Sequence, residues 1–422
     1  MRKLILFIII ISLGIFAYFK FFNSQNIDVV LDNLEDEYFN VERYTIFGTH
    51  FNIQGCMDKK LDGLLELVLK NKDEELKVDT LFMKDTKTCF KLSDKNNEGI
   101  NLEDLKEGNF VLLVKQTKEE EKKYYSLKNN TNYNNLTYYT ISNNFKNNKI
   151  EIKFNIYKEK DYLSFNISEE KLPNDVYDIT IDPGHGGKDP GASYKYNGKV
   201  YNESELTLRI ALLLKKDLED QGFKVKLTRT SDIMLNNYGI GGRSSIPNEV
   251  KSKYSLSIHL NSYSSKMTYG GVEVYTPNDI NYEFADLLAL NISEIVGYSK
   301  KNTEKINNGV YYTSFSESDI LESNQGMIDD GLKPYDIKLG SPYMFMIREV
   351  GGICTYAYVD GRNPSHGINN YSNSNQTAEP YLIELGYINY DKDIENLENR
   401  SDLFSKAITN AIKEYLKSNK NV

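Results

Sequence analysis

The chain has 422 residues, of which 40% are hydrophobic and 26% are charged, and its formal net charge is −9. This composition is typical of a globular protein, and the length is enough for two ordinary domains. The acidic balance argues against a nucleic-acid binder, because such proteins need a basic surface to contact phosphates.

The first 22 residues have the pattern of a transmembrane anchor. Arg2 and Lys3 precede an uncharged run over 4–19, and Phe21 and Phe22 extend it to the ~20 apolar residues that span a bilayer. Positive charge before the run and acidic residues after it orient the following chain outward. A cleaved signal peptide has a similar pattern, but no Ala-x-Ala-like site follows. We expect a single-pass protein of a bacterial cytoplasmic membrane, or a secreted protein if the segment is cleaved.

The next two segments differ in character. Residues 23–40 are acidic and polar, and we interpret them as a stalk. Residues 41–172 contain short runs rich in β-branched and aromatic residues, several of which alternate with polar residues as half-buried strands do. These runs are 44–47, 51–53, 79–83, 110–114, 138–141 and 150–156, separated by solvated stretches such as 118–123 and 129–135. The pattern predicts an all-β, sandwich-like domain.

The chain has three cysteines, which are too few for a disulfide scaffold. Cys56 and Cys89 could pair within the all-β domain. Three reduced and partly buried thiols, with Cys354 as the third, explain the sequence equally well. None of the three has the spacing of a metal motif.

From residue 176 to residue 420 the pattern alternates between strands and helices. We expect strands at 176–181, 223–228, 254–258, 271–275 and 381–384, and helices at 203–221, 243–253, 282–296 and 403–416. Alternation of this kind predicts an α/β domain whose twisted, mostly parallel sheet has helices on both faces.

Four side chains with metal or acid–base chemistry lie at the ends of these elements. His185 follows the first strand across Asp-Pro-Gly, Glu203 opens the first helix, and His259 and Glu384 each close a strand. Carboxyl ends of parallel strands meet at one edge of the sheet, so we expect the four to converge. Two histidines, one carboxylate and an open position for water make a hydrolytic zinc site, beside which a spare glutamate can act as the base.

Each of these residues also has an ordinary interpretation. A histidine after a strand is often a capping or surface residue, and a glutamate in a first helical turn often complements the helix dipole. However, the chain has only four histidines, and two of them fall at strand ends. Glu384 stands inside the apolar run Leu-Ile-Glu-Leu, where an unpaired charge is costly unless a cation or polar partner lies nearby.

Residues 176–420 resemble the zinc-dependent N-acetylmuramoyl-L-alanine amidases of bacterial cell walls, the amidase-3 type. The segments that carry the resemblance occur in the family's order: Ile-Asp-Pro-Gly-His-Gly-Gly from residue 181, Glu-Ser-Glu-Leu from 203, Ser-Ile-His-Leu-Asn-Ser from 257 and Leu-Ile-Glu-Leu-Gly-Tyr from 382. The resemblance implies that His185, Glu203 and His259 bind Zn²⁺ and that Glu384 is the catalytic general base. It also implies hydrolysis of the amide between N-acetylmuramic acid and L-alanine in peptidoglycan, with a zinc-bound water as the nucleophile.

Four further polar residues are candidates for substrate contact. Arg243 and Asn261 fall in segments that match the family, and Arg348 and Arg362 could grip the carboxylates of a stem peptide. Ordinary ion pairs are an equal explanation for the last two. We interpret His366 as a loop residue, and His50, in the all-β domain, is not expected near zinc.

The sequence therefore favours a membrane-tethered peptidoglycan amidase. Its all-β domain would be a spacer, a wall-binding module or a docking place for a regulatory protein. A zinc peptidase acting on the stem peptide is an alternative, and so is a catalytically silent wall-binding or regulatory protein. Retention of all four of His185, Glu203, His259 and Glu384 speaks against the silent alternative.

Overall fold

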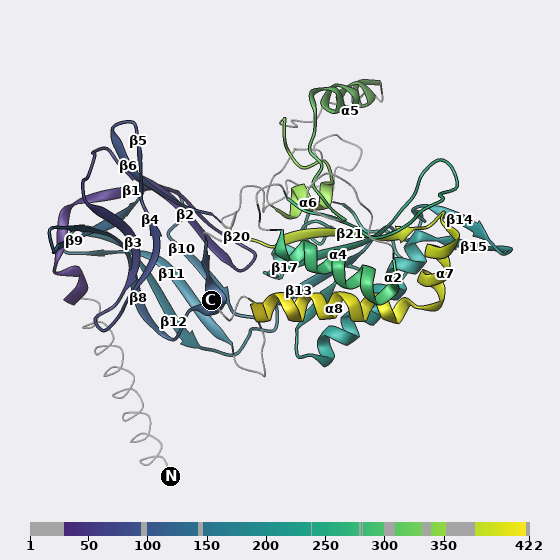
Figure 1. Ribbon diagram of the computed structural model, residues 1–422, viewed down its shortest axis with the longest axis horizontal. Helices are drawn as coiled ribbons and strands as arrows, with labels where there is room; N and C mark the ends of the chain where they lie inside the picture. The colour runs from purple at the N-terminus through teal and green to yellow at the C-terminus, as the bar shows by residue number, and fades with distance from the viewer. Residues whose placement is uncertain are drawn as a thin grey trace, which may run out of the picture.

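The computed structural model describes residues 29–93, 99–141, 147–237, 239–277, 280, 282–298, 309–329, 331, 339–351 and 376–418. These residues form an all-β lobe and an α/β lobe that lie side by side (Figure 1). The expected anchor at 1–22 lies outside the described residues, as do Cys354, Arg362 and His366. Within the described ranges, no helix is both long enough and apolar enough to cross a membrane.

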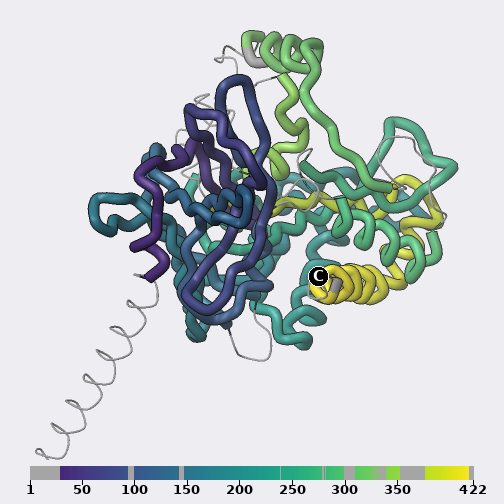
Figure 2. The backbone as a smooth tube through the Cα atoms, turned by 60° about the vertical axis from the view of Figure 1, so that its left-hand side comes forward, coloured from purple at the N-terminus to yellow at the C-terminus, as the bar shows by residue number. Residues whose placement is uncertain are grey.

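A single 13-stranded sheet forms the N-terminal lobe. Its strands are β1 Leu34–Phe47, β2 His50–Met57, β3 Leu64–Lys70, β4 Glu75–Thr80, β5 Phe82–Lys84, β6 Lys87–Leu92, β7 Ile100–Asn101, β8 Gly108–Lys118, β9 Glu121–Asn129, β10 Asn135–Tyr139, β11 Asn148–Tyr157, β12 Lys160–Glu169 and, from late in the chain, β20 Gln376–Thr377. The all-β prediction is confirmed, but hydrogen bonds join the strands into one sheet rather than two. β8 pairs with β3, β9 and β12, and the sheet curves around one core (Figure 2).

Alternate residues of these strands fill the core of this lobe. On β11, Ile150, Ile152 and Phe154 point inward, while the residues between them are polar and more exposed. On the pair β2 and β6, Cys56 lies directly opposite Cys89 and the two form a disulfide. Of the two possibilities that the sequence left open, the structure has the pairing.

The predicted stalk at 23–40 is wrong over the part that the structure describes. Val30, Leu31 and Leu34 are buried in a small apolar cluster against β8, and β1 already begins at Leu34. Acidic residues alternate with these apolar positions and point to solvent, as Asp32 does where it pairs with Lys158. The acidic composition therefore marks the outer side of a strand and turn, not a linker.

The α/β lobe is organised around a six-stranded sheet in the order β16-β13-β17-β21-β18-β19. The bounds are β13 Ile179–Pro183, β16 Val225–Leu227, β17 Tyr254–Asn261, β18 Glu273–Tyr275, β19 Val310–Tyr311 and β21 Glu379–Tyr387. Every pairing is parallel except that of β18 with β21, so the prediction of a mostly parallel sheet is confirmed. A separate hairpin, β14 Ser193–Tyr196 and β15 Lys199–Asn202, leads into the first helix of this lobe.

Helices cover both faces of this sheet, as predicted. One layer contains α2 Glu203–Asp220, α8 Ser401–Ser418 and α4 Glu283–Val296, with α8 packed between the other two (Figure 1). The other face carries the short helices α3 Ile246–Glu249 and α6 Phe345–Val350, and α5 Glu317–Asp329 and α7 Asp391–Asn399 complete the lobe. In α2, the stripe Leu206, Ile210 and Leu214 is buried against the sheet. The predicted helix 243–253 is reduced to α3, whose Pro247 is tolerated only in its first turn.

The two lobes are joined through backbone as well as side chains. β20 pairs in parallel with the end of β1, with Phe47 opposite Thr377, and the Gly48 amide donates to the Thr377 carbonyl at 3.0 Å. β21 begins two residues after β20. The Thr49 and Tyr254 hydroxyls also lie 3.4 Å apart across the junction. The start of β21, the strand that carries Glu384, is thus anchored to the all-β lobe.

Candidate metal centre

The turn after β13 brings His185 to the edge of the sheet. His185 has a left-handed backbone, with φ at 58°, and Gly186 and Gly187 continue the turn with positive φ. At Gly184, a Cβ atom would lie 2.5 Å from Cε1 of His259. The turn therefore requires glycine before His185, because any side chain there would displace the second imidazole.

Glu203, the first residue of α2, lies between the two histidines. Its Oε2 is 3.2 Å from His185 Nε2, and its Oε1 is 3.0 Å from His259 Nδ1. One donor atom from each residue lies within 4.8 Å of the other two. Tetrahedral zinc with ligand bonds of about 2.0–2.2 Å places ligand atoms about 3.3 Å apart, so two imidazoles and one carboxylate fit such an ion. The structure brings together the three residues proposed as ligands.

Neighbouring groups fix the orientation of these donors. Asp189 Oδ2 lies 2.8 Å from His185 Nδ1, which directs the other ring nitrogen, Nε2, at Glu203. The Glu203 carboxylate accepts hydrogen bonds from the Ala192 amide at 3.0 Å and the Leu260 amide at 2.9 Å. These contacts fix the direction in which each donor atom points.

The charges at the site favour a cation. Burial works to raise the pKa of Glu203, but hydrogen bonds from His185 and His259 outweigh it and hold that pKa well below its usual range. Burial likewise works to lower the pKa of His185, but the Glu203 and Asp189 carboxylates outweigh it, and the net shift is upward. Glu203 is therefore an ionised carboxylate in a largely buried position, the kind of donor that a divalent ion needs.

Glu384 lies beside this group but is not part of it. On β21 it stands opposite His259 of β17 and opposite Glu273 of β18. Its Oε2 is buried and has no hydrogen-bond partner among the described residues. Burial, followed by the negative charges of Glu203 and Glu273, raises the pKa of Glu384 well above its usual range. A buried Glu384 oxygen with no partner among the residues that the structure describes, next to a His-Glu-His group, fits a site that takes a cation and water.

Two of the residues predicted to contact substrate, Arg243 and Arg348, are buried and bonded to other protein groups, and their contact with substrate stays a prediction. Arg243 donates to Asp182 Oδ1 at 3.1 Å and to the carbonyls of Pro183 at 2.7 Å and His185 at 2.6 Å. It therefore holds the turn that presents His185. Arg348 on α6 pairs with Glu349 at 3.0 Å and donates to the carbonyls of Pro342 and Tyr343, just before the helix.

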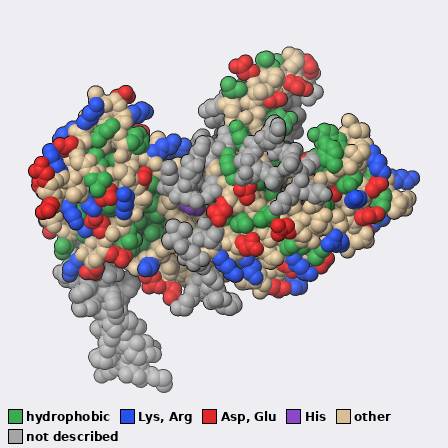
Figure 3. All heavy atoms as spheres, in the orientation of Figure 1, with side chains coloured by type: hydrophobic (Ala, Val, Ile, Leu, Met, Phe, Trp, Pro, Cys, Tyr) green, Lys and Arg blue, Asp and Glu red, His purple; other side chains and the backbone are tan. Residues whose placement is uncertain are grey.

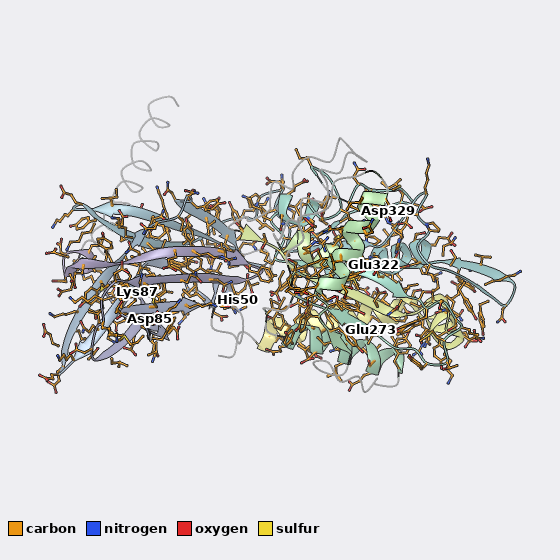
Figure 4. All side chains as sticks on the ribbon, turned by 90° about the horizontal axis from the view of Figure 1, so that it is seen from above. His50, Asp85, Lys87, Glu273, Glu322 and Asp329 are labelled. Atoms are coloured by element: carbon orange, nitrogen blue, oxygen red, sulfur yellow. A yellow bond between two sulfur atoms is a disulfide. The ribbon has the colours of Figure 1, made fainter. Side chains whose placement is uncertain are left out.

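Asn261 does lie at the rim of the site, where its Nδ2 donates to Glu273 Oε2 at 3.0 Å. Arg362 lies outside the described residues. His50, the first residue of β2, belongs to the all-β lobe and lies apart from Glu273 in Figure 4. That it does not bind zinc stays a prediction.

The sequence reasoning missed Asp189 and Glu273. Glu273 is buried and accepts hydrogen bonds from Asn261, Tyr275 and Tyr387. A signal for it was present, because Val-Glu-Val inside a short apolar strand is the same anomaly that singled out Glu384. Asp189 gave no comparable signal, since its role depends on the turn that folds it back onto His185.

Comparisons with known proteins match the α/β part of the chain, in which this group of residues lies. The family model for N-acetylmuramoyl-L-alanine amidase, Amidase_3, matches residues 179–414. The chain is 35% identical over 129 residues to the probable cell wall amidase LytH of Staphylococcus aureus, and this match covers 30% of the chain and 40% of LytH. The matched part therefore spans less than half of that relative's length.

Solved structures similar to the chain include two amidases. One is the catalytic domain of CwlV, an N-acetylmuramoyl-L-alanine amidase from Bacillus (Paenibacillus) polymyxa var. colistinus, at 22% identity and a TM-score of 0.38, covering 57% of this chain and 99% of that one. The other is the N-acetylmuramoyl-L-alanine amidase AmiC2 of Nostoc punctiforme, at 22% identity and a TM-score of 0.38, covering 58% and 99%. With more than half of its residues matched by the family model, the chain belongs to the Amidase_3 family of N-acetylmuramoyl-L-alanine amidases.

Proposed function

We propose that this chain is a zinc-dependent hydrolase that cleaves the amide between N-acetylmuramic acid and L-alanine in peptidoglycan. The observation that carries the proposal is the convergence of His185, Glu203 and His259 on one point, with Glu384 opposite His259 on the next strand. Membership of the amidase family supplies the bond that is cut.

The residues of the site divide the work between them. His185, Glu203 and His259 would hold Zn²⁺, which when bound supplies a Lewis acid for the amide carbonyl and acidifies the attacking water. Glu384 would take the proton from that water and return it to the nitrogen of L-alanine as the C–N bond breaks. Asp189 and Arg243 would keep His185 in place, because one contacts its ring and the other its carbonyl.

Product analysis tests this function. Purified peptidoglycan is digested with the protein, with and without a chelator, and the released peptides are sequenced from their amino ends. The proposal expects stem peptides that begin with L-alanine, released only when metal is present. A zinc peptidase would instead leave L-alanine on muramic acid. A silent wall-binding protein would release nothing, and a zinc content near zero in the folded protein would favour that alternative.

We also propose that the protein works outside the cytoplasm, tethered by the apolar segment at 4–22. The disulfide between Cys56 and Cys89 supports an oxidising compartment, because such bonds are rare in the cytosol. Acidic and basic side chains are interspersed on the face shown in Figure 3, and the net charge of the chain is −9. Attraction to an anionic wall would therefore be weak, and a tether would do the localising. Protease treatment of intact protoplasts should remove both lobes; full protection would contradict this location.

A further inference from the structure

Three tyrosines form an aromatic cluster at the same edge of the sheet as Glu384. Tyr387, at the end of β21, is buried, and Tyr263 stacks on it with ring centroids 5.9 Å apart and planes 18° apart. Tyr269 packs edge-on against Tyr387 at 6.3 Å. The outer two rings remain 58% and 52% exposed, respectively. We call these three residues the tyrosine cluster; exposed aromatic surface beside a reaction site commonly marks ligand contact.

Glu273 anchors the cluster to the proposed reaction site. Its buried carboxylate accepts a hydrogen bond from the Tyr387 hydroxyl at 2.6 Å and others from Tyr275 and Asn261 at 3.0 Å each. Glu273 also stands opposite Glu384 in the pairing of β18 with β21. Glu273 therefore links the Tyr387 hydroxyl to the proposed base, Glu384. The Tyr387 ring cannot move away without breaking its buried hydrogen bond to Glu273.

The segment that presents the two exposed rings, residues 262–270, is held firmly. Asn389 Nδ2 donates to the carbonyls of Tyr263 at 2.7 Å and Ser265 at 2.8 Å. At the end of the segment, a Cβ atom on Gly270 would lie 2.1 Å from Asp393 Oδ2, so the backbone sits directly on α7. Because the two rings are already held in position, little conformational entropy of the protein would be lost when a ligand binds to them.

The charges around the cluster select a neutral ligand. The carboxylates of Glu273 and Asp393 lie beneath the cluster, where they accept hydrogen bonds from the hydroxyl and the amide of Tyr387, and Lys266 is already ion-paired with Asp391. An anionic stem peptide would be repelled here, whereas an N-acetylated sugar carries no charge. The C–H face of a pyranose ring packs on an aromatic ring, and its hydroxyl and acetamide groups can hydrogen-bond to the polar rim.

We propose that the tyrosine cluster is a glycan-binding subsite that takes a neutral N-acetylhexosamine ring of the strand bearing the cleaved amide, stacked on the exposed face of Tyr263. This assignment rests on the proposed function for its substrate. Sugar binding itself does not require cleavage and can be measured without it.

The test uses the full chain carrying Glu384→Gln and a neutral β-1,4-linked N-acetylglucosamine tetramer, with binding followed by calorimetry. Tyr263→Ala should weaken binding about tenfold, whereas Tyr263→Phe should bind within about twofold, because only the ring is needed. Tyr269→Ala should weaken binding as well. The matched control is Tyr133→Ala, which removes a tyrosine that is 44% exposed on the other lobe and should bind normally.

Equal binding by the Tyr263→Ala and parent proteins, at unchanged melting temperature, would overturn the assignment, and so would an equal loss in Tyr133→Ala. Amide hydrolysis is measured separately on the chain with Glu384 intact. Tyr263-dependent sugar binding without any amide hydrolysis would sink the proposed function and leave this subsite standing. Normal amide hydrolysis together with sugar binding that does not depend on Tyr263 would overturn the subsite and leave the proposed function standing.

Discussion

His259 of β17 and Glu384 of β21 lie directly opposite each other in the parallel pairing of these two strands. One is a proposed metal ligand and the other the proposed base, so the sheet itself sets their separation. Glu203 comes from a different element, α2, and reaches both histidines from the side. This division means that metal binding and proton transfer can be removed separately by mutation.

Glu384→Gln should keep the metal and lose the reaction. The amide has nearly the shape of the carboxylate but cannot accept the proton, so amide hydrolysis should fall by about 10²–10⁴-fold. Metal content by mass spectrometry and turnover on peptidoglycan check this together. Loss of metal from this variant would show that Glu384 is a ligand and that the assigned roles are wrong.

His259→Ala should lose metal and activity together, because only two of three protein donors remain. His50→Gln is the control, since that histidine lies in the other lobe and should leave the zinc content unchanged. Turnover at the parent rate by His259→Ala in chelator-treated buffer would refute the zinc mechanism.

Gly184→Ala should weaken metal binding although no ligand is changed. The added Cβ would lie 2.5 Å from Cε1 of His259, so the imidazole has to move. Gly326→Ala is a matched control: it adds the same atom on α5, where nothing lies within 4 Å. Titration with a competing chelator compares the two affinities, and equal values would mean that the ring has room to shift.

Arg348→Ala should act on stability and not on substrate affinity. Removing Arg348 breaks its buried ion pair with Glu349, and the loss of one partner of a buried pair costs about 3–5 kcal/mol. Denaturant unfolding measures the loss, and KM per folded molecule should stay near the parent value. A raised KM without loss of stability would restore the substrate-binding role first expected for this residue.

His50 should make the protein less stable as the pH falls from about 7 to 4. Burial lowers the pKa of His50 from 6.5 to about 4. Between these two pH values, His50 is protonated in the unfolded chain but neutral in the folded chain. The contribution of neutral His50 to the free energy of unfolding is fully present above pH 6.5 and is lost as the pH falls to 4. This loss amounts to about 3 kcal/mol. His50→Gln cannot titrate, so the gap in unfolding free energy between the two proteins should change across this range. A constant gap would contradict the shift.

The sequence was most informative where a local pattern decides the structure. The helix at 203–221 is found as α2 at Glu203–Asp220, because its apolar stripe repeats every three or four residues. Glycines around His185 and a carboxylate inside an apolar strand likewise identified site residues without any tertiary information. Strands such as β9 escaped detection, since Glu121, Lys122 and Lys123 on its exposed start hide the apolar residues that follow.

What the sequence could not supply depends on contacts between distant segments. Arg243 and Arg348 look alike in sequence to arginines that grip a substrate, and only the packed structure reveals that backbone carbonyls and a carboxylate surround them. The pairing of Cys56 with Cys89 follows from the register of β2 against β6. Glu273 gains its partners only when three strands come together.

Because β20 pairs with β1, the first half of the chain buttresses the second. A fragment trimmed to the α/β half would strip Gln376 and Thr377 of the strand that they now pair with, just upstream of β21. It would also open Glu379 to water, since that carboxylate is buried with its Oε2 directly against Gly48. In such a fragment the position of Glu384 on β21 should be less well fixed than in the whole protein. Assays on an excised domain would therefore underestimate the rate of hydrolysis by the intact chain.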